Sequence, residues 1–155
     1  MAEITPVDEQ QGMIFPPNAM GQVEQMVYFA SGFTQYRPYN VGNTADAATS
    51  PAAVAPVANA TYSGKICVPQ GDTTTTAGWY RAVIQGVCNA AVDGDSTDVG
   101  LGDFLEVIAA GTAFIIDHAT APTGSAAAIA REANTGAAAT KEIYLLGHQV
   151  VIASS

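Results

Sequence analysis

The longest stretch of alternating residues in the chain runs from residue 79 to residue 90. Successive side chains of a β-strand point to opposite faces, so this alternation predicts a half-buried strand. The face that we expect to point inward is built mostly from small residues and carries Tyr80, Ala82, Ile84, Gly86, Cys88 and Ala90. The opposite face carries Trp79, Arg81, Val83, Gln85, Val87 and Asn89.

Shorter runs with similar patterning lie on both sides of this segment and are separated by turns that contain glycine. They predict strands at 65–68, 104–108, 112–118 and 142–152. A tight Ala109-Ala110-Gly111 turn joins the second and third of these strands, and Gly147 breaks or bends the last one. Residues 93–103 are expected to form a polar loop.

Two segments fit both a helix and a strand. The apolar spacing near residues 23–30 suits a helix capped by Asn18, but the run Met26-Val27-Tyr28-Phe29 favours a strand, which we prefer. The alanine-rich segment 125–133 favours a helix of about two turns by propensity. A helix this short is marginal on its own, and a strand alternation is also present. The Asn-Thr-Gly sequence that follows predicts a turn.

The chain is expected to divide near residue 60. Residues 1–60 are predicted to form an extended arm and loops, with one strand or short helix at 23–31, and residues 61–155 a β-rich domain. Within the first part, residues 40–61 are dominated by Asn, Thr, Ala and Pro, and two prolines exclude a helix across them. A loop or an extended arm is expected there.

The N-terminal arm carries an isolated apolar group, Met13, Ile14 and Phe15. Three such side chains are too few to make a core of their own. They either clip onto a partner protein or lie back over the chain's own domain, and the sequence leaves both alternatives open. All three are therefore candidate interface residues.

Charge is sparse and mostly negative. Charged residues make up 12% of the 155 residues, about half the usual share, and the net charge is −9. A surface this poor in charge is weakly hydrated, so we expect neighbouring molecules to cover much of it. The alternative is an alanine- and threonine-rich monomer with an ordinary surface.

Nucleic acid and membranes are not expected as partners. The five basic residues are scattered along the chain, so they cannot neutralise a run of phosphates. No stretch approaches the ~18 apolar residues that span a bilayer. The acidic N-terminus does not resemble a signal peptide, which predicts synthesis in a cytoplasm.

Candidate catalytic and metal-binding groups carry weak signals. Residues 93–98 place three carboxylates at the spacing of a calcium loop, but Asp98 stands where such a loop needs glycine, so a solvated turn is expected. Asp117 and His118 are neighbours on a predicted strand and therefore point to opposite faces. We expect no catalytic, cofactor-binding or metal-binding residue, and we interpret His118 as a strand residue at a sheet face or subunit contact.

The cysteines and the larger aromatic residues have structural interpretations. Cys67 and Cys88 are expected to be buried thiols, because cytoplasmic disulfides are rare and two cysteines fit no metal spacing. Tyr36, Tyr39 and Trp79 are expected to be core residues or interface anchors rather than a platform for stacking bases.

Three consecutive pieces of the C-terminal half resemble bacteriophage capsid decoration proteins, also called cement or head-stabilisation proteins. Residues 98–105 (Asp-Val-Gly-Leu-Gly-Asp-Phe-Leu) are similar to a small-residue turn that leads through Gly-Asp into a strand. Residues 128–136 are similar to an alanine, glutamate, alanine and turn segment, with Arg131 where a small or aliphatic residue is more usual. Residues 143–146 (Ile-Tyr-Leu-Leu) resemble the strand that follows.

This resemblance implies a small β-barrel or β-tulip, a strand at 125–133, and a homotrimer without cofactors on the outer surface of a virion. The implied partners are the major capsid protein and other copies of the chain. The protein itself is expected to be synthesised in the host cytoplasm. The implied role is to cement neighbouring capsomers against the pressure of packaged DNA. Other phage structural proteins (head fibre, tail tube or tail tip) are alternatives. A small β-barrel enzyme or ligand-binding protein that uses His118 is the alternative from another class.

Overall fold

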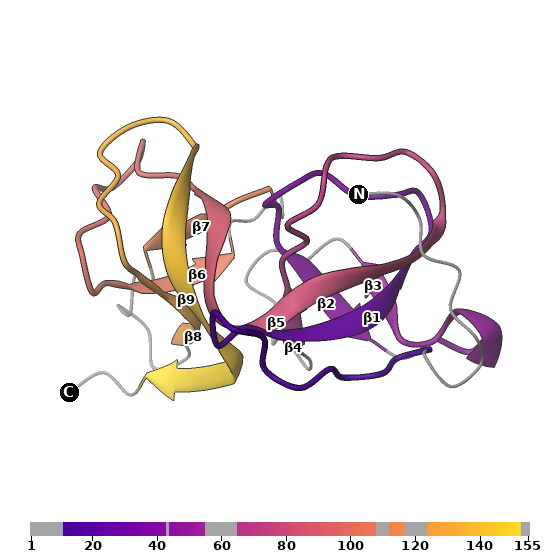
Figure 1. Cartoon of the computed structure of the whole chain (residues 1–155). Coiled ribbons are helices and arrows are strands. Elements are labelled where there is room, and N and C mark those ends of the chain that lie inside the picture. Colours follow the sequence, from indigo (N-terminus) through magenta and orange to yellow (C-terminus); the bar gives the residue numbers. More distant parts are fainter. Residues whose placement is uncertain (1–10, 43, 55–64, 108–111, 117–123, 153–155) are drawn as a thin grey trace.

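The computed structural model describes residues 11–42, 44–54, 65–107, 112–116 and 124–152. These residues form a mainly β fold with nine strands, labelled in Figure 1, and a short 3-10 helix at Ala47–Thr49. The strands are β1 (Val23–Phe29), β2 (Tyr39–Gly42), β3 (Ala52–Val54), β4 (Lys65–Cys67), β5 (Gly78–Val92), β6 (Phe104–Val107), β7 (Phe114–Ile116), β8 (Gly124–Ala130) and β9 (Ala139–Ile152).

The C-terminal half closes into a five-stranded barrel, which confirms the predicted fold class. Its strands follow the order β5-β7-β6-β8-β9, and β9 returns to pair antiparallel with β5, from Gly86 opposite Leu145 to Val92 opposite Ala139. The link between β5 and β7 is parallel, whereas the other pairs are antiparallel. The inner faces share one apolar core, whose largest members include Leu105, Phe114, Ile143 and Leu145.

The N-terminal half continues the same sheet through the first part of β5. There β1 pairs antiparallel with β5 and parallel with β3, and β2 joins β3 to β4. Val68, directly after β4, exchanges two backbone hydrogen bonds with Val83 of β5, at 2.9 and 3.1 Å. Figure 1 shows β1–β4 on one side of the molecule and β6–β9 on the other, with β5 running between them.

Aromatic rings fill the core of the N-terminal half. The ring centroid of Phe29 lies 5.2 Å from that of Phe33, 5.3 Å from that of Tyr39 and 6.1 Å from that of Tyr80. The ring pairs are tilted or edge-to-face, which is the geometry that aromatic side chains prefer. Burial of these large rings compensates for the shortness of β2, β3 and β4.

Gly86 marks the point where β5 passes from one core to the other. It has a φ of +103°, and a Cβ there would lie 2.8 Å from the carbonyl oxygen of Gly21. Glycine alone adopts this conformation readily and leaves room for the N-terminal segment. Inward-pointing residues on either side of it lie in different cores: Tyr80, Ala82 and Ile84 in the aromatic core, and Cys88, Ala90 and Val92 in the barrel core.

Most of the strands predicted from the sequence are confirmed. The inner face expected for residues 79–90 is buried throughout, and both ambiguous segments are strands, β1 and β8. The remaining predicted strands correspond to β4, β6, β7 and β9, and β9 begins three residues earlier than expected. The predicted turn at 109–111 lies outside the described residues.

The prediction of a loop or an extended arm over residues 40–61 is wrong at residues 40–42 and 52–54, where β2 and β3 lie. Neither run alternates clearly, but each is paired on both sides, β2 with β3 and β4, and β3 with β1 and β2. The amide of Tyr28 also donates to the carbonyl of Pro51, just before β3, at 3.0 Å. Neighbouring strands, rather than local preference, make these strands. The division of the chain into residues 1–60 and 61–155 stays a prediction.

Candidate interaction surfaces

The arm residues Met13, Ile14 and Phe15 lie along β1. The amide of Phe15 donates to the carbonyl of Glu24, and the amide of Met26 donates to that of Met13, both at 2.9 Å. Residues 13–15 thus add a short antiparallel stretch to the sheet. The described part of the arm therefore lies back over its own chain, yet the side chains of Met13 and Ile14 stay exposed and accessible to a partner.

Phe15 anchors the arm. Its ring centroid lies 3.7 Å from the guanidinium carbon of Arg81, and Arg81 also forms an ion pair with Glu24 at 3.7 Å. A cation over an aromatic face is attractive by roughly 0.5–1 kcal/mol at exposed sites. The turn that follows is closed by Asn18, whose Oδ1 accepts from the amide of Gln22 at 3.0 Å. The Phe15 ring is therefore packed against a residue of its own chain.

The other predicted interface residues are spread through the fold. Tyr39 and Trp79 are core residues, only 8% and 7% exposed, so they offer little surface to a partner. Tyr36 is half-buried with a φ of +64°, and its amide donates to the carbonyl of Pro69 at 2.9 Å. His118 lies outside the described residues. The structure does not gather Tyr36, Tyr39 and Trp79 into one site.

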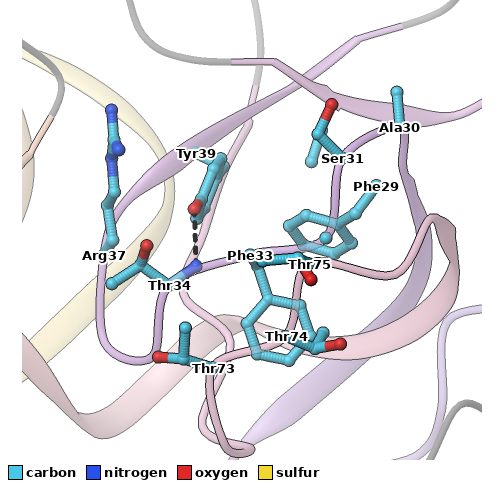
Figure 2. A pocket seen from close by; sticks show the side chains of 12 residues that line it. Phe29, Ala30, Ser31, Phe33, Thr34, Arg37, Tyr39, Thr73, Thr74 and Thr75 are labelled. Carbon is cyan, nitrogen blue, oxygen red and sulfur yellow. Dashed lines mark hydrogen bonds between the residues drawn. The ribbon is translucent and has the colours of Figure 1, made fainter.

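An open pocket of about 390 Å³ lies beside the aromatic core (Figure 2). Its walls come from residues 29–34, Arg37, Tyr39, Ala53 and the threonines at 73–75. Figure 2 shows the hydroxyl of Tyr39 facing the backbone of Thr34, whose amide donates to it at 2.9 Å. The lining residues, all within the described part of the chain, include no acid, histidine or cysteine. The pocket thus offers hydroxyl groups and the Arg37 guanidinium, but no acid–base pair.

Large apolar side chains form a row across the outer face of the barrel. Strand register places Phe104 of β6 opposite Ile129 of β8. Ile129 lies opposite Tyr144 of β9, which in turn lies opposite Val87 of β5. Phe104 is 42% and Tyr144 37% exposed, and the other two are half-buried. Neighbouring strands are ~4.8 Å apart, so these four residues, the apolar row, span about 14 Å.

Charged side chains border the apolar row on both sides. On one side Arg131 Nε donates to Glu142 Oε1 at 2.8 Å, and the amide of Arg131 donates to the carbonyl of Glu142 at 3.0 Å. On the other side, Glu106 follows Phe104 on the outer face of β6. An uncharged centre with a charged rim is a common anatomy of protein interfaces.

Sequence reasoning did not single out the apolar row, although a signal for it was present. In a strand with one solvated face, apolar residues occupy every second position. Phe104-Leu105 and the run at 143–146 are instead apolar at consecutive positions, so that both faces of the strand carry apolar side chains. Strands that are apolar at both parities are typical of sheets covered on both faces. Among the described residues, Phe104 and Tyr144 stay exposed on this face.

The cysteines do not supply a nucleophile. Burial raises the pKa of Cys88 to about 12, with a smaller contribution from the charge of Glu142, and burial raises the pKa of Cys67 well above its usual value. Both are free and buried, as predicted. Reactive thiols have lowered pKa values, so these two stay protonated and inert at neutral pH.

The acidic turn is used for local structure. Asp93 Oδ1 accepts from the amide of Asp95 at 3.0 Å. Within the described ranges, no three His, Cys, Asp or Glu side chains gather where they could hold a metal ion. Over the same residues, no helix has the length and apolar character needed to cross a membrane.

These features define a mainly β protein with a closed five-stranded barrel, a second half that shares β5, and an exposed apolar row. No family model and no curated protein matches the sequence. Among solved structures, the chain is similar to the head fibre gp8.5 N base of bacteriophage phi29, with a TM-score of 0.54 and 12% sequence identity. The match covers 83% of this chain and 98% of that chain. At this level of identity the likeness shows a shared fold.

Proposed function

We propose that this chain is a structural protein of a bacteriophage virion and that it binds the outer surface of the head. The observation that carries the proposal is the fold shared with a head fibre base over 83% of this chain and 98% of that one. The resemblance of residues 98–105, 128–136 and 143–146 to capsid decoration proteins supports the same role from the sequence side.

The surface chemistry supports a role in assembly. Covering the exposed apolar side chains of Met13, Ile14 and the apolar row with another molecule is favourable, because it removes apolar surface from water. Weak contacts that are repeated over a symmetric shell add up to a high effective affinity, so the role requires no strong ligand site. The net charge of −9 repels packaged DNA, which favours a place outside the shell. A non-enzymatic role is part of the proposal.

The finer proposal is that the chain cements neighbouring capsomers by binding the major capsid protein as a homotrimer. A cement bridges two capsomers, so it resists their separation and stabilises the filled head. The base of a head fibre is the second candidate, and the fold likeness favours it. Such a base needs only to anchor on the shell and need not bridge capsomers.

Virions that lack the protein provide the test. Purified protein is added to them, its position is determined by cryo-electron microscopy, and the release of DNA on heating is followed. Binding to the outer head surface with a raised release temperature supports cementing, and the same binding with an unchanged temperature supports a fibre base. Virions that already carry the protein are the control, because their sites are filled. Failure to bind heads, or binding only to tails, contradicts the proposal.

A further inference from the structure

We infer that the outer face of the barrel, with the apolar row at its centre, is the surface by which this chain binds the head. Its partner there is a protein surface that carries apolar side chains inside a ring of lysine and arginine. The identity of this partner as a protein of the head rests on the proposed function. The position and the chemistry of the face follow from the described residues alone.

Exposed apolar side chains gather on and beside this face. The apolar row crosses four neighbouring strands over about 14 Å, and its members Phe104 and Tyr144 are 42% and 37% exposed. Leu101, in the turn just before β6, is 75% exposed. These three make up half of the six large apolar side chains that stay exposed in the described part of the chain. A stable interface has an apolar core of this kind inside a polar rim.

The described part of the chain leaves the face open. Residues 13–15 are bonded to β1, which lies on the other side of β5 from β6 and β8 (Figure 1). The described part of the arm therefore does not cover the apolar row. Another protein that covers the row removes apolar surface from water, which favours binding by roughly 25 cal/mol for each Å² buried.

The rim of the face is acidic. On one side of the row lies Glu106, on the outer face of β6. On the other side, Arg131 Nε donates to Glu142 Oε1 at 2.8 Å, and Glu132 Oε2 accepts from the amide of Glu142 at 2.7 Å. Three carboxylates and one guanidinium, which is already paired, give this rim a net charge of −2. A partner of this face therefore meets excess negative charge.

The charge of the rim selects the class of partner. An acidic rim repels the phosphates of nucleic acid and of anionic lipids, and it attracts a protein surface that carries lysine or arginine. A second copy offers no ring of basic side chains among its described residues. Arg131 is already paired with Glu142. Lys141 lies opposite the buried Ala90, on the inner side of β9, and the other three basic residues lie in the N-terminal half. The occupant is therefore a different protein.

Binding to virions that lack the protein tests the apolar part. The purified full chain is added to them, and bound protein is separated from free protein by sedimentation. Phe104→Ala and Tyr144→Ala should each bind on the order of 10-fold more weakly than the wild type, because each removes an aromatic ring from the centre of the contact. Tyr28→Ala is the matched control, since it removes a half-buried tyrosine ring from β1 in the other half of the molecule, and it should bind like the wild type.

Charge reversal at low salt, where screening is weak, tests the acidic rim. Glu106→Lys places a positive charge against the basic partner, so it should bind on the order of 10-fold more weakly than the wild type. Asp72→Lys is the matched control, because it changes the net charge equally at an exposed acid of the N-terminal half, and it should bind like the wild type. The difference between the two variants should shrink as the salt concentration rises.

Circular dichroism checks that each variant is folded. If Glu106→Lys does not fold, Glu106→Gln replaces it, with Asp72→Asn as its control. If the alanine variants do not fold, Tyr144→Cys replaces them, and a thiol reagent reports whether the head covers that position. The reagent should label Tyr144→Cys quickly in the free protein and slowly on the virion, because the native cysteines are buried and do not contribute. Ser31→Cys, at an exposed position of the N-terminal half, should react equally in both states.

The outcomes separate this inference from the proposed function. A wild type that does not bind the head contradicts both. A wild type that binds, together with Phe104→Ala and Tyr144→Ala that bind equally well, overturns the inference alone. Binding of Glu106→Lys that equals the wild type, or equal labelling of Tyr144→Cys on and off the virion, also overturns it. A changed oligomeric state of free Tyr144→Ala in light scattering would assign the row to a contact between copies and overturn it as well.

Discussion

Replacing Asn134 with alanine should loosen the corner where β5 ends and the turn before β9 begins. Its side-chain Nδ2 donates to the carbonyls of Val92, Gly136 and Ala137 at 2.7, 3.0 and 3.2 Å. The backbone of Asn134 exchanges two further bonds with Val99, at 2.8 and 2.9 Å. One buried side chain thus connects the end of β5 to the turn that leads into β9.

The cost follows from these contacts. Nδ2 has two hydrogens, so the three contacts amount to two hydrogen bonds of about 1 kcal/mol each. The carbonyl of Gly136 keeps the amide of Gly94 as a donor, at 2.9 Å, and the loss of the Nδ2 donor at the buried carbonyl of Val92 adds roughly 1–2 kcal/mol. Asn134→Ala should therefore lower the free energy of unfolding by about 3–4 kcal/mol, out of a total of about 5–15 kcal/mol. Asn134→Asp keeps the shape but places an ionised carboxylate against carbonyl oxygens. It should cost more than alanine at neutral pH and recover as the pH falls to about 4, where the protonated carboxyl regains one donor.

Urea unfolding provides the assay, followed by circular dichroism and by the fluorescence of Trp79, the single tryptophan. Asn89→Ala, at an exposed asparagine of β5, is the control and should change the free energy of unfolding by less than about 0.5 kcal/mol. A loss below about 1 kcal/mol for Asn134→Ala would refute the reasoning. So would an Asp variant whose stability, relative to the Ala variant, does not rise as the pH falls.

Phe29→Ala should lower the free energy of unfolding by about 3–5 kcal/mol, since it removes the ring that contacts three others; a loss near 1 kcal/mol in urea unfolding would count against the aromatic core. Gly86→Ala should cost about 2–4 kcal/mol through its positive φ and the nearby carbonyl, whereas Gly42→Ala, with open space around it, should cost less than about 1 kcal/mol; equal costs would contradict the argument. Cys67 and Cys88 should resist thiol reagents at about pH 8 until the chain unfolds. Fast labelling of the native chain would contradict this prediction. Since folding raises the pKa of both thiols, keeping them protonated and buried adds stability below about pH 9, and that stability is lost as the pH rises further.

The alternation of apolar and polar residues over long segments of the sequence predicts much of the barrel. Alternation over twelve residues is enough to orient β5, because the hydrophobic effect acts on every second side chain. The strands β2 and β3 escape prediction because each has only three or four residues, and their hydrogen bonds come from strands distant in sequence. The same cause makes β8 a strand despite its alanines, since pairing with β6 and β9 outweighs a weak helical preference.

The interaction surfaces are harder to predict than the strands. Sequence reasoning singles out Met13, Ile14 and Phe15 as one isolated apolar group, but it cannot tell that Phe15 lies against Arg81, because that contact spans 66 positions. The apolar row depends on the register of four strands, and register is a property of the folded sheet rather than of any one segment. The one local signal for the apolar row is the presence of apolar residues at consecutive positions in β6 and β9.

The central claim is that the chain works as part of the outer surface of a phage head. Antibody labelling of native virions, viewed by cryo-electron microscopy and compared with virions that lack the protein, tests it most directly. The account predicts label and extra density at regular positions on the outside of the head, and neither on the deletion virions. Label confined to the tail, or virions that contain none of the protein, would contradict it.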